Sequence, residues 1–134
     1  MDDLVQWLRA QLDEDERIAR AAQRQRGGGE WVARADASGI VAVEGLPVRA
    51  GEPIPVVLHP DEDETAEHIA EHDPARVLRE IDAKRQIIEQ HERYAAERRR
   101  MMGGWDPQSD DSPILAALAT VYADRPGYRE EWRP

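Results

Sequence analysis

The chain has 134 residues, the length of one domain, and its 28 acidic residues outweigh its 18 basic residues to give a net charge of −10. This charge disfavours non-specific binding to nucleic acid and to anionic membranes, and the absence of cysteine excludes disulfides, thiolate metal sites and cysteine nucleophiles. No apolar run approaches the roughly 20 residues of a membrane-spanning helix, and the N-terminus lacks the apolar core of a signal peptide. We therefore expect residues 1–134 to form a single small domain in the cytoplasm.

The first part of the chain predicts a helix followed by short strands. Apolar residues recur at helical spacing over residues 3–25 and predict one amphipathic helix. These residues are Leu4, Leu8, Leu12, Ile18 and Ala22. Over residues 30–58, three segments rich in β-branched residues are separated by glycine and proline, which predicts two or three short strands in an antiparallel sheet.

The centre of the chain predicts two helices joined by a forced break. A short helix over about 62–72 ends before Asp73-Pro74, because Asp73 caps a new helix and Pro74 suits its first position. The new helix runs to about residue 100 and is about 40 Å long at roughly 1.5 Å per residue. A small domain does not need a helix of this length, so we expect its far end to project or to pair with another chain.

The last quarter of the chain predicts a loop, a fourth helix and a tail. Residues 103–111 combine glycine, proline, serine and aspartate and predict a mobile loop. Ser112-Pro113 then opens a helix. The apolar residues of this helix are Ile114, Leu115, Leu118, Val121 and Tyr122. In a chain without Phe, the other aromatic residues must supply bulk, so we expect Tyr128 and Trp132 of the tail to pack against the first helix or the strands.

Together these elements predict a mainly helical α+β fold. A small antiparallel sheet of two or three strands follows the first helix, and a helix pair hinged at Asp73-Pro74 follows the sheet. A final helix with a docked C-terminal tail completes the fold. Leu, Ile and Val number only 25 in total, so the core is small and a partner subunit could complete it.

One cluster has the spacing of a metal site. Glu64, His68 and His72 recur every four residues and share one face of the predicted short helix, where two imidazoles and a carboxylate can bind a divalent cation. Residues 68–72 also match the H-x-x-E-H pattern of inverted zinc peptidases. That pattern needs a further acidic ligand from a distant helix, and Pro74 breaks the helix directly after it, so solvated or capping histidines are the commoner interpretation. A metal- or small-ligand-binding protein or enzyme stays an alternative.

The long helix carries the residues that we assign to an interaction. Ile87 and Ile88 are adjacent, so they lie about 100° apart around the helix and cannot both face one narrow seam. One of them is therefore available to a partner. Within one chain, His91 lies too far along the same helix to join the pair of histidines before the break. We assign Ile87, Ile88 and His91 to contact with a protein partner or with a second copy of the chain.

The basic cluster Arg98–Arg100 offers another alternative, a nucleic-acid-associated regulator that contacts phosphate. Cations also complement the C-terminus of a helix, and the chain as a whole is acidic. No serine lies in the context of a nucleophile and no glycine-rich segment has the pattern of a phosphate-binding loop. We therefore assign no catalytic residue, expect no cofactor, and favour a non-enzymatic interaction or regulatory module.

Three segments of the chain resemble a family of small uncharacterised proteins from actinobacteria. They are MDDLVQWLRAQLDEDERIARAA at the start, HIAEHDPARVLREIDAKRQIIEQHE in the middle and ATVYADRPGYREEWRP at the end. Their most specific parts are the His72-Asp73-Pro74 break and the ending from Tyr122 to Trp132. The resemblance implies no assigned activity.

Overall fold

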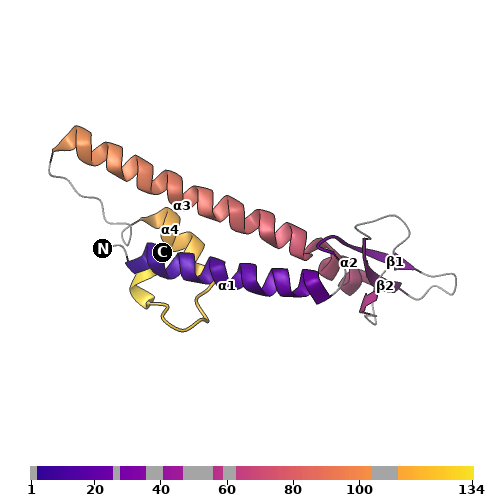
Figure 1. Cartoon of the computed structure of the whole chain (residues 1–134). Coiled ribbons are helices and arrows are strands. Elements are labelled where there is room, and N and C mark those ends of the chain that lie inside the picture. Colours follow the sequence, from indigo (N-terminus) through magenta and orange to yellow (C-terminus); the bar gives the residue numbers. More distant parts are fainter. Residues whose placement is uncertain (1–2, 26–27, 36–40, 47–55, 59–62, 104–111) are drawn as a thin grey trace. The chain divides into compact units, whose positions relative to one another are not determined.

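Figure 1 shows the computed structural model of the chain, which describes residues 3–25, 28–35, 41–46, 56–58, 63–103 and 112–134. Its elements, in chain order, are α1 (Asp3–Gln25), β1 (Trp31–Ala35), β2 (Val41–Gly45), β3 (Val56–Leu58), α2 (Asp63–Glu71), α3 (Pro74–Met102), α4 (Pro113–Thr120) and the 3-10 helix η2 (Glu130–Trp132). This order confirms the predicted mainly helical α+β fold. The predicted mobile loop at 103–111 lies, apart from Gly103, outside the described residues.

The contacts divide the chain into two compact units. Unit 1 comprises Met1–Glu14 and Ile81–Pro134, and unit 2 comprises Asp15–Glu80. Helices α1 and α3 each contribute residues to both units. The single domain over residues 1–134 stays a prediction. Among the described ranges, no helix is both long enough and apolar enough to cross a membrane.

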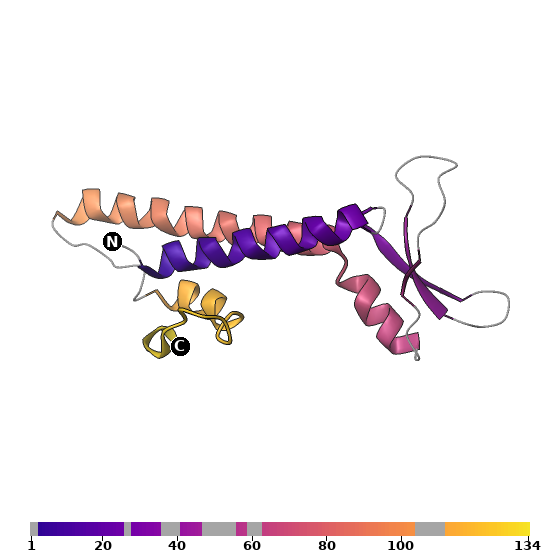
Figure 2. The ribbon, with the colours of Figure 1, turned by 60° about the horizontal axis from the view of Figure 1, so that its bottom comes forward.

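In unit 1, the first half of α1 lies antiparallel to α3. Arg9 forms an ion pair with Glu92 at 2.8 Å, and Asp13 forms one with Arg85 at the same distance. The later residue of α1 therefore pairs with the earlier residue of α3, so the two helices run in opposite directions. Figures 1 and 2 both show these segments side by side. Exposed ion pairs contribute about 0–1 kcal/mol each, so they orient the helices more than they stabilise them.

Apolar side chains from α1, α3, α4 and the tail form the core of unit 1. The buried residues are Leu4, Val5, Leu8, Leu12, Ile81, Ile88, Ala95, Leu115, Ala116, Ala119, Tyr122 and Trp132. Each large side chain among them contributes about 1.5–3 kcal/mol by leaving water. The three leucines at spacing four confirm the first part of the apolar stripe predicted for the first helix.

Helix α4 begins as predicted. The Oγ atom of Ser112 accepts a hydrogen bond from the Leu115 amide at 3.3 Å, and Pro113 occupies the first helical position. The helix turns Leu115 and two alanines toward the core, whereas Ile114 and Val121 are 57% and 64% exposed. Because positions 114 and 121 are seven residues apart, they share one stripe on the side away from the core.

The tail docks on α1 through a cluster of aromatic rings. The ring centroid of Trp7 lies 5.4 Å from that of Trp132 and 5.7 Å from that of Tyr128. The Trp7 indole nitrogen also donates a hydrogen bond to the carbonyl oxygen of Pro126 at 3.1 Å. Of the two predicted docking places, the first helix or the strands, the tail uses the first helix.

Unit 2 contains a three-stranded antiparallel sheet in the order β1-β2-β3. Strand β1 pairs with β2 along its whole length, and α2 packs against both strands. Ala42 and Val43 of β2 and Ala66 of α2 are buried, so this contact uses small side chains. Ile18, which belongs to the predicted stripe of the first helix, is 49% exposed in this unit.

Candidate interaction surface

Asp73 connects the start of α3 to the first strand. Its carboxylate is buried, and its Oδ1 atom accepts a hydrogen bond from the Arg76 amide at 2.8 Å, which confirms the predicted cap. Its Oδ2 atom accepts a second hydrogen bond from the Trp31 amide at 2.9 Å. The Ala75 amide adds a third link between these segments by donating to the Gly29 carbonyl oxygen at 2.8 Å. The break at Asp73-Pro74 is therefore fixed by hydrogen bonds within unit 2.

The structure places the two predicted metal-binding histidines next to each other at the end of α2. Their ring centroids are 4.4 Å apart, and both side chains are exposed. The Nδ1 atom of His72 lies 2.8 Å from the His68 carbonyl oxygen. A carbonyl oxygen can only accept, so this Nδ1 carries the proton in the contact and only Nε2 stays available as a ligand.

No third ligand joins this pair in the described part of the chain. Glu64 is exposed near the start of α2, and none of the His, Asp or Glu side chains that the structure describes form a group of three or more able to hold a metal ion. A structural zinc site has four protein ligands and a catalytic one has three. Among the described residues, the two adjacent imidazoles are therefore the only ligands that the geometry supplies for a metal ion.

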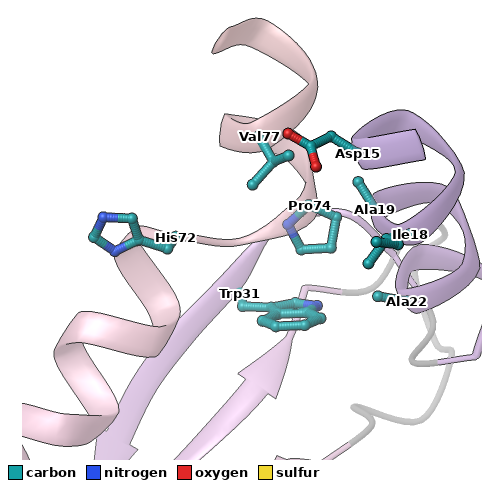
Figure 3. Close-up of a pocket in the computed structure, with 8 residues that line it drawn as sticks. All are labelled: Asp15, Ile18, Ala19, Ala22, Trp31, His72, Pro74 and Val77. Carbon is teal, nitrogen blue, oxygen red and sulfur yellow. The ribbon is translucent and has the colours of Figure 1, made fainter. Parts of the chain in front are cut away.

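Unit 2 also contains an open hollow of about 310 Å³. Its lining residues are Asp15, Ile18, Ala19, Ala22, Trp31, His72, Pro74 and Val77. Figure 3 shows Ile18, Ala19 and Ala22 of α1 gathered on one side of Trp31, with the ring of His72 on the other side. The Trp31 indole nitrogen is already used, because it donates to the Gly28 carbonyl oxygen at 3.2 Å. The hollow is thus mainly apolar and explains why Ile18 keeps half of its surface exposed.

The two adjacent isoleucines of α3 that we assigned to an interaction lie in different environments. Ile88 is 1% exposed and belongs to the core of unit 1, whereas Ile87 is 41% exposed. The offset of about 100° between neighbouring helical residues accounts for this difference. Ile87 is therefore the one that a partner can reach, and Ile88 contributes to folding.

Ile87 lies in an apolar groove, which we call the α3 groove. Its lining residues are Ala83, Gln86, Ile87, Gln90, His91 and Tyr94 of α3 and Ile114 of α4. The groove has a volume of about 570 Å³. Tyr94 and Ile114 are 58% and 57% exposed, so three large side chains from two helices present apolar surface at one place. The sequence assigned Ile87 and His91, with Ile88, to an interaction, which stays a prediction, and it assigned neither Tyr94 nor Ile114.

His91 lines the same groove, but its Nδ1 atom is not exposed there. Its Nδ1 atom is buried, and no hydrogen-bond partner for it lies among the described residues. Buried polar atoms are usually hydrogen-bonded. This nitrogen stays unpaired among the described residues and is closed to a ligand in the groove.

The basic cluster at the end of α3 is partly engaged with Tyr94. Arg98 donates a hydrogen bond to the Tyr94 hydroxyl at 3.2 Å, and its guanidinium carbon lies 5.7 Å from the centre of the Tyr94 ring. Arg99 and Arg100 are exposed in the last turn of the helix, where cations are favourable against the helix dipole. Arg98 thus supports the wall of the α3 groove.

These features define a mainly helical α+β protein with an apolar groove on its longest helix. The model of DUF6221, a family of unknown function, matches residues 1–134, so the chain belongs to this family. The match confirms the resemblance to a family of uncharacterised proteins. No curated protein and no solved structure is significantly similar to the chain.

Proposed function

We propose that the chain is a non-enzymatic interaction module of the cytoplasm that binds a protein partner through the α3 groove. The observation that carries this proposal is the exposure of Ile87, Tyr94 and Ile114 around one groove. Contiguous apolar surface that a folded chain leaves in water marks interaction sites.

The chemistry of the groove supports a protein partner. Tyrosine is enriched among the residues that dominate binding energies, because it offers a large rigid surface with a polar end. Burying one exposed aliphatic or aromatic side chain contributes up to about 1.5–3 kcal/mol. Because Ile87, Tyr94 and Ile114 are each only about half exposed, they contribute part of the binding energy, and the rest of the interface must add to it to meet the cost of association.

The two other predicted functions have less support. A metal-binding function has the adjacent rings of His68 and His72, but lacks a third ligand among the described residues. A nucleic-acid-binding function has Arg98–Arg100, but Arg98 contacts Tyr94 and the groove beside it is apolar. Phosphate binding would use cations rather than an apolar groove.

Site-specific photo-crosslinking in the native host tests the proposal. Tyr94 is replaced by p-benzoyl-phenylalanine, and we expect one dominant crosslinked protein after irradiation. The control places the same probe at Asp82, which is exposed on the same helix but does not line the groove.

The same experiment is then repeated with Ile87→Glu, which places a charge in the apolar groove. We expect the crosslinked product formed from position 94 to disappear. Crosslinking from the control position 82 should be weak and should stay the same. Identical products from both positions, or a product that Ile87→Glu does not reduce, would show that the α3 groove is not the binding surface.

A further inference from the structure

We draw no further inference here: the strongest candidate, the apolar α3 groove between Ile87, Tyr94 and Ile114, carries nothing beyond the proposed function, because nothing in the described part of the chain shows what covers it.

Discussion

The carboxylate of Asp73 lies 2.9 Å from the backbone nitrogen of Trp31 and 2.8 Å from that of Arg76. One buried side chain thus caps the longest helix and satisfies the first amide of β1. A helix cap contributes about 1 kcal/mol, and a buried amide left without its acceptor costs about 1–3 kcal/mol. The break between α2 and α3 is a fixed joint of unit 2 rather than a simple interruption by proline.

Because both hydrogen bonds are accepted by Asp73, a substitution of this residue should strongly lower the free energy of unfolding. Asp73→Ala removes both acceptors and should lower the free energy of unfolding by about 2–4 kcal/mol. Urea unfolding followed by circular dichroism measures the loss. Asp82→Ala is the matched control, because Asp82 is an exposed aspartate on the same helix and its removal should change the free energy of unfolding by less than about 0.5 kcal/mol. Equal effects of the two substitutions would show that the Asp73 hydrogen bonds do not stabilise the fold.

Two glycines with positive φ allow the cost of backbone strain to be measured apart from the cost of a steric clash. Gly127 has a φ of 88°, and a Cβ atom there would lie 2.7 Å from the indole nitrogen of Trp7. Gly103 has a φ of 44°, and nothing lies within 4 Å of its Cβ position. Gly103→Ala should therefore cost about 1 kcal/mol, and Gly127→Ala should cost about 2–4 kcal/mol because the aromatic cluster must also move. Similar losses in thermal unfolding would contradict close docking of the tail on Trp7.

The histidine pair predicts weak metal binding. His72 uses Nδ1 in its contact with the His68 carbonyl oxygen, so the pair offers few free ligand atoms. Protein purified without a histidine tag should contain well below one zinc ion per chain by elemental analysis. A full equivalent of zinc that disappears in His68→Ala and His72→Ala would instead establish a metal site.

The contact between Glu130 and Arg133 in the tail predicts a lowered pKa that can be measured. Hydrogen bonds from Arg133, at 2.8 and 3.0 Å, together with its positive charge lower the pKa of Glu130 below the ordinary value. The pair therefore favours the ionised carboxylate, and its contribution to folding is present above the ordinary pKa and lost as the pH falls through the lowered pKa. Arg133→Gln should raise the pKa of Glu130 in an NMR titration. An unchanged pKa would show that the two side chains do not meet in solution.

The sequence was sufficient for features that depend on local chemistry. Asp73 and Ser112 each precede proline and cap a helix. The cap by Asp73 and the start of a helix at Ser112-Pro113 were both predicted. The leucine spacing of α1 likewise predicts the face that is buried. These features depend on residues within one or two helical turns of each other, so the local sequence contains the information.

Features that depend on distant segments could not be predicted in this way. The second hydrogen bond of Asp73 joins residues 42 positions apart. Which of Ile87 and Ile88 is buried depends on where α1 and α4 pack against α3, and the exposure of Ile114 depends on the same packing. The seven-residue spacing of Ile87, Tyr94 and Met101 was a signal in the sequence, but only the burial of their neighbours shows that it faces outward.

The most direct test of the interaction function compares two neighbouring isoleucines under the same substitution. Ile88→Ala should lower the free energy of unfolding by about 2–5 kcal/mol, because it leaves a cavity in the core. Ile87→Ala should lower it by less than about 1 kcal/mol and should reduce the yield of the product crosslinked from position 94. The opposite pattern, in which Ile87→Ala destabilises the fold as much as Ile88→Ala and leaves that yield unchanged, would contradict a binding surface on α3.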